Sequence, residues 1–288
     1  MKIVILGGTG LLGQALQKEI KKRKYNVVTV ARQNADYCID ITDDAELKRM
    51  IIETKPNLVI NACAIVNHKI CDENPEIAYI TNSRPSSILS NLAKEYNFKY
   101  VYISTDGYFN GDKNSKHSEL SQIELLNEYA RTKYIGEIFA LTNKKSLVVR
   151  TNIVGFRGNN NQPTFVEWVI KALMNKENMT LFDDYYTSSI STTQFSKVLL
   201  DIIEKDISGV LNIASSEVFS KKEFIETLAE NFNFSLENTK TGKVSTLTTS
   251  RRADSLGLDV SKVENILGYK LPTLKEVINQ LKKEYDNV

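Results

Sequence analysis

The chain has 288 residues, of which 42% are hydrophobic, so it can bury one large core or two modest ones. Its formal net charge is only +2. Nucleic-acid-binding proteins usually carry a strongly basic face, so we expect no nucleic-acid partner. The one basic run, residues 21–24, ends a predicted helix, where cations complement the helix dipole, and we interpret it as structural.

Sulfur and imidazole groups are scarce. The chain contains three cysteines and two histidines, namely Cys38, Cys63, Cys71, His68 and His117. Their spacing fits neither a disulfide framework nor a metal site. The apolar run at the N-terminus stops at Gly7, too short for a signal peptide, and no stretch approaches the roughly 18–20 apolar residues of a membrane span. We expect a cytoplasmic protein with no metal and no membrane partner.

Short β-branched segments alternate with amphipathic helical patterns in the first half of the chain. Strands are predicted at 2–7, 26–31, 57–62, 99–105 and 146–151, and helices from about Leu11, from about Asp43, over 86–96 and around Tyr129. Nearly continuous apolar strands separated by helices are typical of a parallel sheet covered on both faces. The sequence therefore predicts an α/β fold with a doubly wound, Rossmann-type sheet.

The alternation loosens after a Gly- and Asn-rich loop at 152–163. Helices are predicted at about 164–176, 191–205, 220–231, 259–268 and 272–285, with a short strand at 209–214. Ser220 and Glu223 have the spacing of a capping box. Trp168 lies in a segment with helical periodicity, and we expect it to pack on the core.

A glycine-rich turn follows the first predicted strand. In "GGTGLLG" the glycines Gly7, Gly10 and Gly13 stand three apart and lead through Thr9 into a helix. Glycines let backbone amides approach a pyrophosphate at the positive end of that helix. No Gly-Lys-Ser/Thr closes the loop, which excludes a P-loop. We predict a dinucleotide site here.

This site suggests a division of the chain. We expect residues 1–152 to form a dinucleotide-binding Rossmann domain and residues 153–288 to form mainly a smaller α/β lobe. A segment at about 185–206 is expected to return to the first domain.

The end of the second strand bears on the choice of dinucleotide. It offers no acid before Asp36 for ribose hydroxyls, but it offers Arg32, which could bind a 2′-phosphate. NADP(H) is favoured, NAD(H) is possible, and a plain surface role for Arg32 stays open. Asp40 is placed to touch the adenine, while Asp43 with Glu46 resembles a helix N-cap pair.

Tyr129 and Lys133 share a helix face if their segment is helical. Among 13 tyrosines, chance gives this spacing about once, so the surroundings decide. Ser104, Thr105 and Asp106 end a predicted buried strand, where ligands of such sheets bind. An ammonium on the next turn lowers the pKa of a phenol towards neutrality. We expect Tyr129 to protonate a carbonyl that takes a hydride from nicotinamide, with Lys133 supporting the phenol and the ribose.

Motifs along nearly the whole chain resemble those of the extended short-chain dehydrogenase/reductases, and among them the dTDP-4-dehydrorhamnose reductase group. The matching pieces are "GGTGLLG", "DYCIDITD", "NACA", "ENPEIAYITN", "STDGYFNG", "YARTKYIGE", "VVRTNIVG" and "LDVSKVENILG". The resemblance implies reduction of the 4-keto group of a nucleotide-activated deoxysugar, with Thr105, Tyr129 and Lys133 as the catalytic triad. It implies that the lobe of residues 153–288 is mainly substrate-binding and holds the nucleotide sugar. It also implies cofactor contacts from Gly7, Gly10, Leu11, Leu12, Asp40, Ile41, Ala62, Cys63 and Ala64.

Departures from the family pattern cluster where the sugar should bind. Gly107 and Tyr108 replace the usual Tyr-Val, and the segment after "NACA" supplies Asn67 and His68. We count Asn67, with Thr105 and Asp106, among the candidate substrate contacts, and we interpret His68 as a loop residue with no role. Arg251 and Arg252 are candidates to bind a diphosphate, or a solvated pair.

Two other functions remain open. The first is a nucleotide-sugar epimerase or dehydratase of the same superfamily; a dehydratase would carry an acid where Gly107 follows Asp106. The second is a non-catalytic, NADP-binding subunit, because the resemblance extends to the regulatory β subunit of methionine adenosyltransferase. The sequence leaves the oligomeric state open, a homodimer being one option.

Overall fold

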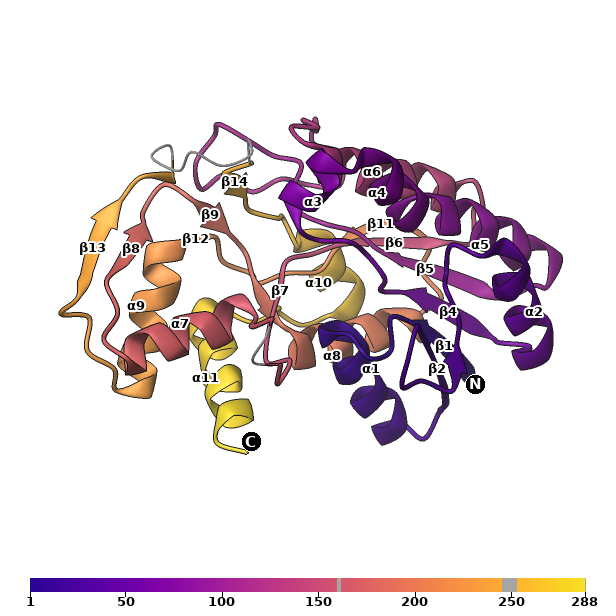
Figure 1. The fold of residues 1–288 in the computed structure, drawn as a ribbon, viewed down its shortest axis with the longest axis horizontal. Coiled ribbons are helices and arrows are strands. Elements are labelled where there is room, and N and C mark those ends of the chain that lie inside the picture. Colours follow the sequence, from indigo (N-terminus) through magenta and orange to yellow (C-terminus); the bar gives the residue numbers. More distant parts are fainter. Residues whose placement is uncertain (160–161, 245–252, 288) are drawn as a thin grey trace. The chain divides into compact units, whose positions relative to one another are not determined.

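The protein is described by a computed structural model over residues 1–159, 162–244 and 253–287 (Figure 1). It divides into two compact units, each assembled from several chain segments. The first unit comprises Met1–Thr105, Leu125–Arg150 and Leu199–Leu211, and the second comprises Asp106–Glu124, Thr151–Val198 and Asn212–Val288.

A seven-stranded sheet forms the centre of the first unit. Its strands are β1 (Lys2–Leu6), β2 (Asn26–Ala31), β3 (Tyr37–Cys38), β4 (Leu58–Asn61), β5 (Lys99–Ile103), β6 (Leu147–Arg150) and β11 (Gly209–Asn212), in the order β11-β6-β5-β4-β1-β2-β3. The central strand β1 pairs in parallel on both sides, with Ile5 opposite Thr29 and Ile60. Strand order reverses at β1, which confirms the doubly wound fold.

Helices cover both faces of this sheet. They are α1 (Leu11–Lys22), α2 (Asp44–Thr54), α3 (His68–Glu73), α4 (Pro75–Asn82), α5 (Arg84–Glu95) and α6 (Glu128–Leu141). Figure 1 shows α4, α5 and α6 on one face and α1 on the other. The core under α2 and α5 includes Leu47, Met50 and Leu89 packed with the β5 rings of Tyr100 and Tyr102.

Two short helices, α3 and α4, were not predicted. Each begins at an asparagine N-cap position, Asn67 for α3 and Asn74 for α4, and Pro75 occupies the first turn of α4. Such short helices give little periodicity, and their starts are visible only through capping residues. They fill the connection between β4 and α5.

The second unit has three small sheets. The pairs are β7 (Ile153–Val154) with β10 (Ile190–Ser191), β13 (Thr239–Gly242) with β8 (Met179–Phe182), and β9 (Tyr186–Thr187) between β12 (Phe219–Ser220) and β14 (Ser255–Leu256). Its helices are α7 (Phe165–Met174), α9 (Lys221–Phe232), α10 (Ser261–Leu267) and α11 (Leu274–Tyr285), while α8 (Thr192–Ile203) runs across the boundary of the two units. The predicted capping box is present at Ser220 and Glu223.

The expectation for Trp168 was wrong. Helix α7 forms as predicted, but the indole is 45% exposed. The buried stripe of α7 runs through Val166, Val169, Ile170 and Leu173, at the spacing of one helix face, and position 168 lies off this stripe.

The chain passes between the two units five times. Residues 106–124 belong to the second unit, and the late segment in the first unit is 199–211, against about 185–206 in the expectation. The assignment of cofactor to one domain and substrate to the other stays a prediction. Throughout the described ranges, each helix is too short or too polar to cross a membrane.

Candidate active site

The glycine turn between β1 and α1 is shaped by contacts that exclude side chains. Gly7 has φ +82°, and a Cβ on it would lie 3.1 Å from the Cys63 Sγ. A Cβ on Gly13 would lie 2.1 Å from the Gly7 carbonyl oxygen. The N-cap, Gly10, makes no side-chain cap bond, and the first turn of α1 has no acid. An anion can therefore approach the amides and the positive end of α1.

Arg32 and Asp40 lie beyond the ends of β2 and β3, as predicted, and both are exposed. The Thr42 backbone N and hydroxyl donate to Asp40 Oδ1 at 2.9 and 2.8 Å. These bonds lower the pKa of the Asp40 carboxyl, and the charge of Arg32 adds to the effect. Ile41, the next predicted contact, is buried.

Asp36, the first acid after β2, accepts hydrogen bonds from Thr29 of that strand. Its Oδ2 accepts from the Thr29 backbone N at 2.8 Å and from the Thr29 hydroxyl at 2.7 Å. These bonds lower the pKa of the Asp36 carboxyl. Asp36 is therefore engaged in the turn, which leaves Arg32 as the exposed charge directly after β2.

Residues Ala62, Cys63 and Ala64 follow β4 and are partly buried. The Cys63 backbone N donates to Asn61 Oδ1 at 3.1 Å. Burial raises the pKa of the Cys63 thiol to about 12, so the thiol stays neutral. Its sulfur packs beside Gly7 as a small apolar group.

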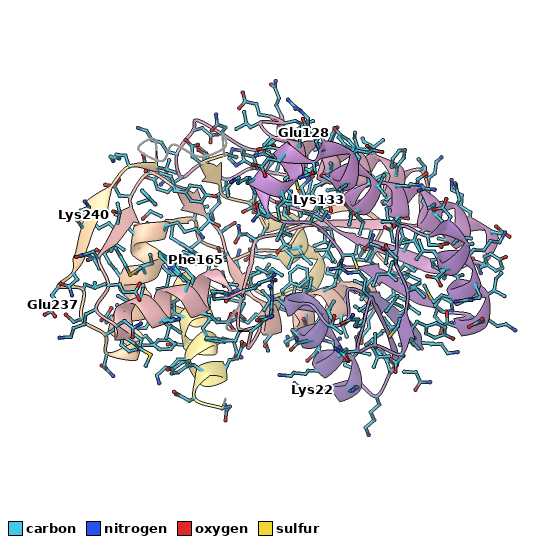
Figure 2. All side chains as sticks on the ribbon, in the orientation of Figure 1. Lys22, Glu128, Lys133, Phe165, Glu237 and Lys240 are labelled. Atoms are coloured by element: carbon cyan, nitrogen blue, oxygen red, sulfur yellow. The ribbon has the colours of Figure 1, made fainter. Side chains whose placement is uncertain are left out.

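Lys133 is enclosed at the carboxyl end of β5. Its side chain points from α6 towards the strands, whereas Glu128 lies at the outer start of the same helix (Figure 2). The Lys133 Nζ donates to the Ile103 carbonyl at 2.8 Å and lies 4.1 Å from the centre of the Tyr102 ring. Burial lowers the pKa of Lys133 to about 7, and Glu137 opposes this shift.

Ser104 and Thr105 continue the chain from β5, and both are buried. The Ser104 backbone N donates to the Val149 carbonyl at 2.7 Å, which fixes the chain just past the strand. Tyr129, one turn before Lys133, is partly buried. The first unit thus contains Thr105, just after β5, and both Tyr129 and Lys133, on α6.

Helix α6 is held against the sheet by close contacts. The Tyr102 hydroxyl donates to the Asn82 carbonyl at 2.9 Å, and a Cβ on Gly136 would lie 2.2 Å from that hydroxyl. Arg150 of β6 and Glu137 form a buried ion pair at 2.8 Å. Glycine at 136 lets α6 approach the tyrosine, which sets the position of Lys133.

The interpretation of His68 as a loop residue was wrong, whereas its having no role is not tested. His68 is the first residue of α3, and its ring stacks on the Tyr129 ring with centroids 4.9 Å apart. Asn127, the N-cap of α6, contacts the His68 Nδ1 through its Nδ2 at 3.3 Å. Sequence separation hid this contact, although the departure from the family pattern at "VNHK" was a signal.

The remaining substrate candidates have different surroundings. In the second unit, Asp106 Oδ2 accepts from Asn152 Nδ2 at 2.7 Å, and Asn152 Oδ1 accepts from the Ser189 hydroxyl at 2.7 Å. Asn67 is exposed, and its side-chain oxygen caps α3 at the Ile70 backbone N. Arg251 and Arg252 lie outside the described residues.

Lys221 in the second unit was overlooked. Its Nζ lies 4.2 Å from the centre of the Phe165 ring and 6.0 Å from that of Phe224. Burial lowers the pKa of this ammonium to about 8, against the effect of Asp106. A lysine directly after the N-cap Ser220 is unfavourable for the helix dipole, which was the available signal.

A doubly wound sheet, a glycine turn after β1, and a tyrosine and lysine four residues apart on the helix beside β5 together define an extended short-chain dehydrogenase/reductase. Over residues 1–287 the chain matches the family model described as "RmlD substrate binding domain", and it belongs to that family.

Three relatives are similar to the chain over most of its length. The "Probable low-salt glycan biosynthesis reductase Agl14" of Haloferax volcanii is 25% identical over 100% of this chain and 99% of its own. A dTDP-4-dehydrorhamnose reductase of Aggregatibacter actinomycetemcomitans is 29% identical over 72% of this chain and 69% of its own. Methionine adenosyltransferase 2 subunit beta of Xenopus laevis is 26% identical over 94% of this chain and 84% of its own.

Solved structures share the fold. A dTDP-4-dehydrorhamnose reductase of Bacillus anthracis, solved in complex with NADP, has a TM-score of 0.89 and 22% identity, and the match covers 98% of this chain and 99% of that one. At this identity the likeness concerns the fold.

Among the residues that the structure describes, no group of three or more His, Cys, Asp or Glu side chains is arranged to hold a metal ion.

Proposed function

We propose that the chain is an NADP(H)-dependent reductase of the 4-keto group of a nucleotide-activated deoxysugar, a precursor for a glycan. The observation that carries this proposal is the enclosure of Lys133 at the end of β5, four residues after Tyr129. A buried ammonium in such a place is costly, and groups of this kind cluster at functional sites. The names of the reductase relatives support the choice of substrate class.

The first unit fits a dinucleotide. The α1 N-terminus has no side-chain cap, and the cradle around Gly7 and Gly13 would be filled by any Cβ. These features would hold the pyrophosphate, while Asp40 would contact the adenosine and Arg32 a 2′-phosphate. When bound, the reduced nicotinamide supplies the hydride.

The chain's own residues protonate and orient the oxygen of the ketone. The Tyr129 phenol gives its proton to that oxygen as the carbonyl carbon is reduced, so that a ketone becomes a secondary alcohol. The Lys133 ammonium stabilises the phenolate that is left, and its burial strengthens this interaction. The Thr105 hydroxyl orients the carbonyl by a hydrogen bond.

The test is NADPH oxidation with a panel of dTDP-, UDP-, GDP- and CDP-linked 4-keto sugars. A reductase oxidises NADPH in amounts equal to the product formed. Tyr129→Phe should lower kcat by about a hundredfold or more, because a positioned acid contributes on this scale, with NADPH binding largely retained.

Other outcomes would decide against the proposal. An epimerase would convert the sugar without net use of NADPH, and a binding subunit would do neither. Full activity in Tyr129→Phe would remove the phenol from the chemistry.

A further inference from the structure

The ring of His68 lies against the ring of the proposed acid. The two rings have centroids 4.9 Å apart and planes 24° apart, which is a stacked contact. Tyr129 is the second residue of α6 and is only partly buried. His68 comes from α3 and supports it from outside that helix.

The hydrogen bonds around Asn127 orient its side-chain amide towards His68. The Asn127 Oδ1 accepts from the Ala130 backbone N at 2.9 Å, so its Nδ2 is the atom that faces the His68 Nδ1 at 3.3 Å. An amide NH₂ donates, so this contact turns the donor group of Asn127 towards a ring nitrogen of His68.

A second bond ties α3 to the start of α6. The Glu128 backbone N donates to Asp72 Oδ1 at 3.0 Å, and Cys71, next to Asp72, is fully buried. Both bonds are made by the residues that directly precede Tyr129, one at Asn127 and one at Glu128. Helix α3 is thus anchored on the turn that carries the phenol, and the position of the His68 ring is fixed with respect to it.

We propose that His68 is a positioning residue that holds the Tyr129 ring in the orientation from which its hydroxyl reaches the ketone. This rests on the proposed function, in which Tyr129 is the acid. In this proposal His68 acts through the ring contact. Since a small misplacement of a reacting group costs much of the rate, loss of this support should appear in kcat.

Steady-state kinetics of three variants test the contact. His68→Ala should lower kcat about tenfold to a hundredfold, as expected for a displaced acid, with the KM of NADPH within about twofold of wild type. His68→Phe keeps a ring and should recover most of the loss, whereas His68→Asn keeps hydrogen-bonding atoms but no ring and should not. Lys69→Ala, an exposed neighbour on α3, is the matched control and should behave as wild type.

A double-mutant cycle separates positioning from general stability. In a Tyr129→Phe background, His68→Ala should cause no further loss, because the group that it positions is absent. Additive losses, or equal losses in His68→Ala and Lys69→Ala, would overturn the proposal.

A readout without turnover distinguishes this proposal from the proposed function. With tyrosines labelled with carbon-13 at the ring Cζ, the Tyr129 resonance is assigned by its loss in Tyr129→Phe. It should shift in His68→Ala and stay in place in Lys69→Ala. A shift in a protein that reduces no 4-keto sugar would leave the ring contact standing and refute the reductase; an unchanged resonance would refute the contact.

Discussion

Lys133 illustrates how a single residue can be kept in an unfavourable state. An unfolded lysine is charged up to about pH 10.5, but burial lowers the pKa of Lys133 to about 7. Between these values the unfolded chain binds the proton more readily, so Lys133 lowers stability as pH falls from about 10.5 to about 7, and the cost stays constant below. Keeping the Lys133 ammonium buried despite this loss of stability is consistent with its proposed interactions with the Tyr129 phenolate and the nicotinamide ribose.

Candidate site residues with a recognisable local spacing could be predicted from the sequence. Their contacts with residues far away in the sequence could not. Tyr129 and Lys133 have a spacing that can be read from the chain, and the glycine turn has both spacing and context. His68 contacts Tyr129 across 61 positions, and Lys221 contacts Phe165 across 56. Such contacts follow from the packing of helices, which no local pattern records.

Arg32 tests the choice of dinucleotide. Arg32→Ala should weaken NADPH binding about tenfold or more and leave NADH binding nearly unchanged, because only NADPH has a 2′-phosphate to pair with the guanidinium. Fluorescence titration of both dinucleotides measures this. Arg49→Ala, an exposed arginine on α2, serves as the control. Equal losses of affinity for NADPH and NADH would show that Arg32 does not bind a 2′-phosphate.

At the scale of elements, α6 contains Gly136 at a position where helix propensity alone would favour alanine. In an open helix, Gly→Ala stabilises by roughly 0.5–1 kcal/mol. At position 136 the new Cβ would meet the Tyr102 hydroxyl at 2.2 Å and the Asn82 carbonyl at 3.0 Å. The packing therefore opposes the intrinsic preference.

Gly136→Ala should destabilise the protein by about 1–3 kcal/mol, the usual cost of overpacking, with a lowered urea midpoint. Arg131→Ala, at an exposed position on the same helix, should leave the midpoint nearly unchanged. A raised midpoint for Gly136→Ala would show that α6 can move away from β5, and that Lys133 is held less tightly than the contacts indicate.

The long elements were predictable because their patterns are strong. The buried strands β1, β4 and β5 and the capped helix α9 fell where apolar runs and the Ser220 capping box indicated. The short α3, of six residues, was missed because a helix of that length rests on tertiary contacts. The orientation of Trp168 was missed because a nearly continuous apolar segment does not show which stripe is buried.

At the scale of the whole molecule, the two units are interleaved along the chain. The first unit is completed by Leu199–Leu211, which brings β11 to the edge of the sheet beside β6. The same segment reaches α1, since Arg23 pairs with Asp201 at 2.7 Å and with Glu204 at 2.9 Å. A cut after residue 152 removes both contributions.

A fragment of residues 1–152 should therefore be poorly soluble or lack cooperative unfolding, because β6 becomes an uncovered sheet edge and Arg23 loses two partners. A fragment of residues 1–211 keeps every segment of the first unit and is the matched control. Urea unfolding and size-exclusion chromatography compare the two. Cooperative unfolding of a monomeric 1–152 fragment would show that β11 is dispensable.

The late position of β11 also sets an order of events during translation. A ribosome adds about 5–20 residues per second, so β11 emerges several seconds after β6, the strand that it covers. During that interval the nascent sheet presents an open edge to the crowded cell. The sheet can therefore be completed only after β11 has been synthesised, so its assembly waits for a segment that follows β6 by more than fifty residues.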